Sequence, residues 1–207
     1  MTEALARLGQ AETSAALKPS LPPIRRDPAR LIFTLDLTSS REHSLQPARI
    51  AIAGMFDAIK SFGAAFVKMV YYRGANECQA SAWHADPEIL IQSMRLGCEA
   101  GVTQIARVLR LALLEPEKIS GVVLVGDHCE EISGELMDLA KSLGQRSRPL
   151  YIFHECADHD LRSLRAKPLF KGMAEISGGG LRRVQARVRF CAAGIAFLGG
   201  GLQRGGD

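Results

Sequence analysis

Long apolar runs, paired cysteines and stacking aromatic side chains are all scarce in this sequence. Its longest apolar run, Phe190 to Gly201, is too short for a membrane span, which needs about 20 apolar residues. The five cysteines are widely spaced, with no C-x-x-C pair and no zinc spacing, so neither a disulfide framework nor a structural zinc site is indicated. Free thiols are typical of a reducing compartment, and the N-terminus lacks the charged-then-apolar pattern of a signal peptide. We therefore expect a cytoplasmic protein with no membrane partner.

The middle of the chain also lacks an excess of positive or negative charge. The formal net charge of +4 comes from the two ends, whereas residues 31–180 are close to neutral. A nucleic-acid-binding domain usually carries a basic stripe with interleaved aromatic side chains, and only Tyr71, Tyr72 and Arg73 combine the two. We expect these tyrosines to pack the edge of a sheet, so no nucleic-acid partner is predicted. The basic ends are interpreted as solvated flanks or as a weak contact for an anionic surface.

The length of 207 residues suits one domain with a sizeable core. Residues 1–29 are rich in proline and contain no aromatic residue, a composition typical of a disordered leader. Order is expected to begin at the apolar run Leu31-Ile-Phe-Thr-Leu, and glycine becomes frequent from residue 194. The predicted organisation is a leader at 1–29, a folded domain at 30–190 and a Gly-rich tail at 191–207.

Short apolar runs alternate with amphipathic stretches along this domain. The expected strands cover residues 31–35, 65–72, 77–83, 122–125, 150–153 and, as a short edge strand, 181–184. Between them, apolar side chains recur at helical spacing over residues 52–59, 89–94, 105–112, 132–143 and 164–173. This alternation predicts an α/β fold: a Rossmann-like, doubly wound, mainly parallel six-stranded sheet with helices on both faces. We expect the strand order 3-2-1-4-5-6, with one antiparallel edge strand formed by the hairpin at Arg73-Gly-Ala-Asn.

Two carboxylates and three hydroxyls stand where such a sheet binds its ligands, beyond the strands' carboxyl ends at the point where strand order reverses. Asp36 follows the first apolar run and Asp127 ends the fourth, so both side chains are expected in one crevice. Thr38 and Ser40 share a tight loop with Asp36, and Thr103 stands at the start of a helix. Such oxygens suit Mg²⁺ or Mn²⁺, which take about six oxygen ligands. Taken singly, these residues are more often turn residues or helix caps, and it is their conjunction that predicts a metal site.

At these positions the sequence resembles the von Willebrand factor type A (VWA) domain family and its metal-ion-dependent adhesion site. That family has D-x-S-x-S after the first strand, a Thr opening a central helix and an Asp after the fourth strand. Asp36-Leu-Thr-Ser-Ser40 is similar to the first part, Gly101-Val-Thr103 to the second and Val123-Leu-Val-Gly-Asp127 to the third. Met173-Ala-Glu-Ile-Ser-Gly-Gly is similar to the family's late helix and glycine pair.

The resemblance implies a protein-protein interaction module that depends on a bound metal ion. Thr38, Ser40 and Thr103 would contact Mg²⁺ or Mn²⁺ directly or through water, while Asp36 and Asp127 would act from behind these ligands. A cation held mainly by neutral hydroxyls stays electrophilic. It can then accept a carboxylate from an Asp or Glu of a partner protein.

Two residues differ from the family pattern at the rim of this site. Gly126 stands where the family usually has Thr, and His128 where it often has Gly. His128 is interpreted either as a donor behind the metal ligands or as an exposed loop residue, and Arg41 is placed with it on the rim that meets the partner. The segments 33–42 and 70–74 also resemble a small cytoplasmic bacterial branch of the family.

The main alternative function is a metal-dependent hydrolase that transfers a phosphoryl group, with Asp36 as nucleophile or base. Such an enzyme would be expected to carry a second carboxylate two residues on, or a Lys clamp. Position 38 is Thr, however, and no Lys stands near the candidate residues in sequence; Arg41 is the one candidate clamp. A thiol-redox role for Cys129, near an expected helix start that can lower a thiol pKa, is a further alternative. The sequence favours a module that is not an enzyme.

Overall fold

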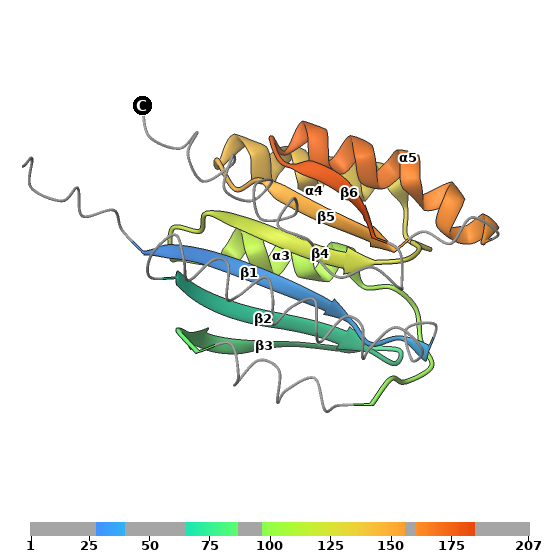
Figure 1. The fold of residues 1–207 in the computed structure, drawn as a ribbon, viewed down its shortest axis with the longest axis horizontal. Coiled ribbons are helices and arrows are strands. Elements are labelled where there is room, and N and C mark those ends of the chain that lie inside the picture. The colour runs from blue at the N-terminus through green and yellow to red at the C-terminus, as the bar shows by residue number, and fades with distance from the viewer. Residues whose placement is uncertain (1–27, 40–64, 87–96, 156–159, 185–207) are drawn as a thin grey trace, which may run out of the picture.

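The sheet has six strands in the order that the sequence predicts. The computed structural model describes residues 28–39, 65–86, 97–155 and 160–184. The strands are β1 (Ala29–Asp36), β2 (Ala65–Arg73), β3 (Glu77–His84), β4 (Gly121–Gly126), β5 (Leu150–Glu155) and β6 (Gly180–Val184). They lie in the order β3-β2-β1-β4-β5-β6 (Figure 1). The β2–β3 pair is antiparallel and the other four pairs are parallel, so the predicted doubly wound sheet with one antiparallel edge strand is confirmed.

The first strand owes its central place to a run of buried residues. Residues 31–38 are all buried, and β4 is buried along its whole length. β1 pairs in parallel with β2 on one side and with β4 on the other. A parallel strand that is covered on both faces carries apolar side chains on both, which explains the nearly continuous apolar runs in its sequence. Asp36, the last residue of β1, is thereby carried into the fold with a residue exposure of 0%.

Three helices, α3 (Ile105–Leu114), α4 (Ser133–Gln145) and α5 (Leu161–Ile176), lie on one face of the sheet (Figure 1). Their buried side chains form one apolar cluster with those of the strands, as the helical spacing predicts. Two predicted core residues are exposed instead: Ile132, which precedes α4, is 74% exposed, and Leu164 in the first turn of α5 is 38% exposed. Both lie at the amino ends of their helices, outside the set of side chains that α4 and α5 bury. None of the described helices is long and apolar enough to cross a membrane.

The opposite face of the sheet is buried as well. Its side chains form a second apolar cluster that includes Leu31, Phe33, Leu35, Val67, Met69, Val123, Val125, Tyr151 and Phe153. Burial on both faces is what a doubly wound sheet requires. The helices expected over residues 52–59 and 89–94 lie outside the described residues, as do nearly all of the leader and the whole of the tail. Those assignments and the domain boundaries stay predictions.

The aromatic and basic residues near the β2–β3 turn pack and pair within the sheet. Gly74 makes the turn at a positive φ of 57°, a conformation that glycine adopts without steric cost. Tyr72 is fully buried. The Tyr71 hydroxyl donates to the Glu77 carboxylate at 2.9 Å, and Arg73 Nε donates to the same group at 2.6 Å. The expectation that these tyrosines pack the sheet edge is therefore confirmed.

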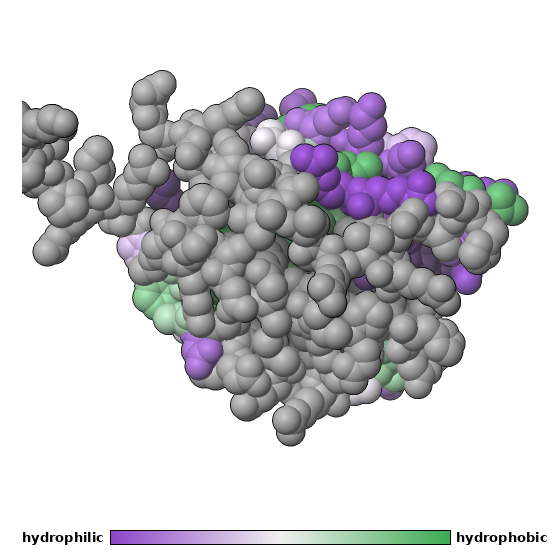
Figure 2. All heavy atoms as spheres, viewed as in Figure 1, coloured by the Kyte–Doolittle hydropathy of each residue, from purple (hydrophilic) through white to green (hydrophobic). Residues whose placement is uncertain are grey.

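The surface over β6 and α5 is strongly hydrophilic (Figure 2). Lys167 and Lys171 of α5 and Arg182 and Arg183 of β6 are exposed. Lys171 lies 3.8 Å from the carboxylate of Glu175, one turn further along the helix. Charged side chains on an edge strand oppose pairing with other chains.

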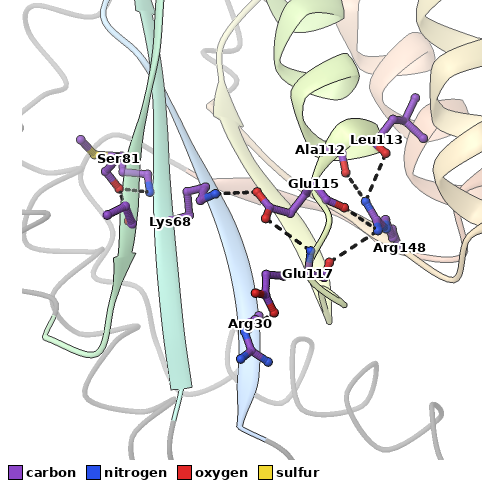
Figure 3. A network of polar contacts seen from close by, with 10 residues as sticks. Arg30, Lys68, Ser81, Ala112, Leu113, Glu115, Glu117 and Arg148 are labelled. Atoms are coloured by element: carbon purple, nitrogen blue, oxygen red, sulfur yellow. Dashed lines mark hydrogen bonds and ion pairs between the residues drawn. The ribbon is translucent and has the colours of Figure 1, made fainter.

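The carboxyl end of α3 is held by two arginines that follow α4. Arg148 donates from Nη1 to the carbonyl of Ala112 at 2.5 Å and from Nη2 to that of Glu115 at 2.9 Å (Figure 3). Arg146 donates to the carbonyl of Leu113 at 2.6 Å. The last carbonyls of a helix have no partner within it, and the helix dipole favours positive charge at that end. The two arginines therefore cap α3.

Lys68 of β2 and Glu115 after α3 form an ion pair (Figure 3). Lys68 Nζ lies 2.6 Å from Glu115 Oε2, with side-chain exposures of 18% and 7%, and 4.9 Å from the centre of the Trp83 ring. Burial alone would raise the pKa of Glu115. The hydrogen bond and the positive charge of Lys68 outweigh burial, so the pKa of Glu115 lies below its usual value. The pair stabilises the folded state as long as Glu115 is ionised.

Arg148→Ala is expected to lower the free energy of unfolding by about 1–3 kcal/mol, because it leaves partly buried carbonyl groups without donors. Urea unfolding followed by circular dichroism measures the loss. Arg146→Ala is the matched control, since its hydrogen bond is exposed, and should cost about 0.5 kcal/mol. Equal losses would mean that Arg148 contributes no more than an ordinary surface arginine.

Glu115→Gln should lower the free energy of unfolding, and the loss should be largest at a pH above the ordinary glutamate pKa. At a pH well below that value the loss should be small. The pKa of Glu115 is lowered in the folded state, so its contribution is complete above the reference value of 4.5. It is lost as the pH falls through the folded value. Urea unfolding of both proteins from about pH 7 to about pH 3 gives the difference in stability, which should shrink on acidification. A difference that grows in acid would contradict the ion pair.

Candidate metal centre

Asp36 and Asp127 are brought to the same edge of the sheet by neighbouring strands. Asp36 is the last residue of β1, and Asp127 comes directly after β4. The two strands are parallel, with Leu35 paired to Val125, so their carboxyl ends coincide. The hydrogen bond to Asp127 is the main cause that raises the pKa of His128, and the charge of Asp36 adds to it. The two carboxylates therefore lie at the same edge of the sheet, at the point where the strand order reverses.

The loop after β1 is folded back on the sheet by its own backbone. The Asp36 carboxylate accepts the Thr38 N–H at 2.8 Å, in the turn that aspartate commonly makes with the backbone two residues on. The Leu37 N–H donates to the Tyr72 carbonyl, and the Glu99 N–H donates to the Leu37 carbonyl, both at 3.0 Å. Thr38 is 3% exposed. Thr38 is therefore buried next to Asp36, with its backbone N–H held by the Asp36 carboxylate.

The segment before α3 lies against the β2–β3 turn. A Cβ atom on Gly101 would stand 1.9 Å from the backbone oxygen of Gly74, so only glycine fits there. Gln104 Nε2 donates to the carbonyls of Arg73 and Gly74, each at 3.3 Å. The turn thereby fixes the segment that carries Thr103.

Thr103 stands before α3 and does not cap it. The N-cap is Gln104, whose side chain makes no capping hydrogen bond, so the reading of Thr103 as a simple helix cap is wrong. The Thr103 hydroxyl accepts the N–H of Glu130 at 3.2 Å, and the Thr103 N–H donates to the Glu130 carboxylate at 3.4 Å. Thr103 is 2% exposed. It is therefore fixed to the loop that carries Asp127.

His128 is a buried partner of Asp127, which excludes the alternative of an exposed loop residue. Its Nδ1 lies 2.8 Å from Asp127 Oδ1, its backbone N–H donates to the same oxygen at 2.9 Å, and its Nε2 lies 3.5 Å from Glu130 Oε1. The hydrogen bond to Asp127 raises the pKa of His128 and burial opposes that shift. His128 thus orients the Asp127 carboxylate from inside the fold. It is expected from the sequence on the rim that meets a partner, and the structure buries it instead.

His154 and Ser163 are further residues of this edge, which sequence reasoning misses. His154 Nε2 lies 3.0 Å from the Asp127 carbonyl oxygen and 3.0 Å from Ser163 Oγ. The Ser163 hydroxyl donates to the Glu155 carbonyl at 3.1 Å, and a carbonyl can only accept, so the proton is assigned to Nε2. Burial lowers the pKa of His154, in agreement with a neutral ring. His154 stands at the end of an apolar strand, and this position is the sequence signal by which it could be found.

The donors offered by Asp36, Thr38, Thr103 and Asp127 are oxygen atoms, which Mg²⁺ and Mn²⁺ prefer. Within the described ranges, no three His, Cys, Asp or Glu side chains are arranged to hold a metal ion. A cation at this edge would therefore depend on the two threonine hydroxyls as well as on the two carboxylates. The donor set fits a hard divalent cation, and its binding stays a prediction. Ser40 and Arg41, also expected here, lie outside the described residues.

The Cys129 thiol lies next to this site but is not activated. Burial raises its pKa, and the hydrogen bonds from Glu131 N–H and Thr103 do not reverse that shift. A redox role would require a lowered pKa. The thiol-redox alternative is therefore disfavoured.

Solved structures that match the chain include VWA domains. The von Willebrand factor type A protein of Catenulispora acidiphila matches with a TM-score of 0.61 and 16% identity, covering 85% of this chain and 42% of that chain. The SpRpn10 VWA domain matches with a TM-score of 0.59 and 14% identity, covering 86% of this chain and 95% of that domain. This chain has the VWA fold.

The VWA fold predicted from the site motifs is therefore confirmed. An aerotolerance-related membrane protein of Bacteroides fragilis NCTC 9343, with multiple mutations to serine, also matches, with a TM-score of 0.62 and 15% identity over 85% of this chain and 99% of that chain. No protein-family model and no curated protein matches the sequence. Identities this low establish the fold alone, so the adhesion site and the cytoplasmic bacterial branch stay predictions.

Proposed function

We propose that this protein is a protein-protein interaction module that binds Mg²⁺ or Mn²⁺ at the carboxyl ends of β1 and β4. The observation that carries the proposal is the convergence of Asp36, Thr38, Thr103 and Asp127 at one edge of a VWA fold. Fold alone does not define function, so the proposal rests on the chemistry of these residues. Two carboxylates and two hydroxyls, each buried or mostly buried, supply the oxygen donors that these ions prefer.

The proposed roles follow from the charge of each donor. Thr38, Thr103 and Ser40 hold the cation directly or through water, and Asp36 and Asp127 balance its charge from behind. A cation held mainly by neutral hydroxyls keeps much of its positive charge. An Asp or Glu carboxylate of a partner protein then completes its coordination in a charge-assisted contact. Recognition in this proposal needs the metal and the partner's carboxylate together.

Exposed apolar side chains near the same edge support a protein partner. Val102 before α3, Ile132 before α4 and Leu161 at the start of α5 are 53%, 74% and 67% exposed. Figure 2 shows apolar surface at the end of the molecule where α5 begins. Apolar side chains left in solvent around a polar centre are typical of surfaces that bind other proteins.

A phosphoryl-transferring hydrolase, the alternative in which Asp36 acts as nucleophile or base, has less support. The Asp36 residue is 0% exposed, and its Oδ1 accepts the Thr38 N–H. A nucleophile or base must come within hydrogen-bond reach of its substrate, whereas this carboxylate is engaged with the backbone of its own loop. We therefore propose a role without catalysis. We place the protein in the cytoplasm on the basis of free thiols such as Cys78 and Cys129.

Thermal unfolding in EDTA, and then with Mg²⁺ or Mn²⁺, tests the metal site. Metal at about 100 times its Kd should stabilise the folded protein by about 2.7 kcal/mol, a rise of several degrees in Tm. Asp127→Asn should abolish the rise, because it removes a carboxylate that balances the cation. Asp138→Asn is the matched control, since Asp138 is exposed on α4, and should leave the rise intact. No rise in the wild type, or an equal rise in Asp127→Asn, would contradict the site.

Capture of a partner from the source cells tests the proposed use of the metal. The wild-type chain with Mg²⁺ should retain a protein that is lost in EDTA and that Asp127→Asn does not retain. Replacing Asp and Glu residues of that protein by amides, one at a time, should identify a single carboxylate that binding requires, since a cation accepts one such ligand. Equal binding in Mg²⁺ and in EDTA, or binding that no single carboxylate controls, would overturn metal-dependent recognition.

A further inference from the structure

The amino end of α3 has no cap of its own. Gln104 makes no capping hydrogen bond, and the first turn contains no acidic residue. The first N–H groups of a helix need partners and favour negative charge. Glu131, which precedes α4, meets both needs: Oε1 accepts the Ile105 N–H at 2.5 Å and Oε2 accepts the Ala106 N–H at 2.8 Å. A carboxylate from a neighbouring loop therefore caps α3 with both of its oxygens.

This cap joins the two segments that carry Thr103 and Asp127. Glu130, next to Glu131, exchanges two hydrogen bonds with Thr103 through its N–H and its carboxylate. Burial raises the pKa of Glu131, and hydrogen bonds from the first N–H groups of α3 and from the Thr103 hydroxyl oppose that shift. Glu130 thus holds the backbone and the hydroxyl of Thr103, and Glu131 holds the first turn of the helix that follows.

We propose that Glu131 is a positioning residue of the metal site, which sets the place of the Thr103 hydroxyl relative to Asp127 and so determines how tightly Mg²⁺ or Mn²⁺ binds. This inference rests on the proposed function. The Glu130 N–H takes one lone pair of the Thr103 hydroxyl, and the other is left for a cation. Mg²⁺ demands nearly ideal octahedral geometry, so a shift of this oxygen weakens binding. Residues that orient metal ligands commonly change metal affinity by about 10–100-fold when they are replaced.

A second acidic contact between α3 and α4 provides a matched control. Glu135, in the first turn of α4, pairs with Arg110 of α3 on the surface, with side-chain exposures of 37% and 53%. Glu135→Gln removes the same charge from the same pair of helices as Glu131→Gln. It does not touch the amino end of α3, and an exposed ion pair contributes little to stability. A loss of metal affinity that Glu131→Gln shows and Glu135→Gln does not is therefore due to the cap on α3.

The experiment measures the Mn²⁺ dissociation constant of the full chain by electron paramagnetic resonance. Glu131→Gln should weaken binding by about 10-fold or more, and Glu135→Gln by less than about 2-fold. Thr103→Val removes the hydroxyl through which Glu131 acts, so adding Glu131→Gln to it should weaken binding by less than about 2-fold further. Hydrogen exchange at the Ile105 and Ala106 amides should be faster in Glu131→Gln than in the wild type, with or without metal.

The outcomes separate this inference from the proposed function. A wild-type chain that binds no Mn²⁺ overturns both. Binding by the wild type with Glu131→Gln unchanged, or with an equal loss in the Thr103→Val background, overturns the positioning role alone. Glu131→Asp keeps the charge but shortens the side chain, so it should weaken binding less than Glu131→Gln. If Glu131→Gln does not fold, Glu131→Asp tests the positioning role in its place.

Discussion

The dipole of α3 is satisfied at both ends by charged residues that flank α4, and the geometry of the site depends on this arrangement. Glu131 before α4 accepts two N–H groups at the amino end, and Arg148 after α4 donates to carbonyls at the carboxyl end. Each charge has the sign that the dipole favours. Because both residues belong to the flanks of a single helix, α3 and α4 form one unit that is tied together at each end. Thr103 stands two residues before α3, so the segment that carries it continues into this helix pair.

Hydrogen bonds to fixed donors allow carboxylates to gather at one buried edge. A carboxylate taken from water is costly unless hydrogen bonds replace its hydration. The structure supplies such partners locally: Asp36 accepts the Thr38 N–H, Asp127 accepts from His128, and Glu131 accepts from the first turn of α3. Backbone N–H groups carry no full positive charge, so they orient a carboxylate without neutralising it. The negative charge that remains at this edge is what the proposed divalent cation would balance.

Sequence reasoning succeeds here where a repeating pattern or the strand order fixes the place of a residue, and fails where one side chain joins two loops. The buried strands are predictable because parallel strands covered on both faces need apolar runs, and the hairpin because Gly74 allows its turn. Asp36 and Asp127 are predictable because parallel strands end together. The cap from Glu131 is not predictable, since it joins residues 26 positions apart in sequence. Periodicity also cannot tell at which residue a helix begins: Ile132 precedes α4 and is exposed although its spacing predicts burial.

Gly101 and Gly126, the glycines of the two motif segments, differ in whether the fold leaves space for a side chain. Gly101 is required by packing, because a Cβ there would collide with the backbone of Gly74. Gly126, which stands where the VWA family usually has Thr, is not required in this way: a Cβ there would meet only the Phe170 ring, at 4.0 Å, an ordinary contact. Gly101 therefore serves to seat the Thr103 segment against the β2–β3 turn. The sheet does not require a glycine at position 126 on steric grounds. Its effect is that the edge beside Asp127 has one hydroxyl fewer than the family pattern.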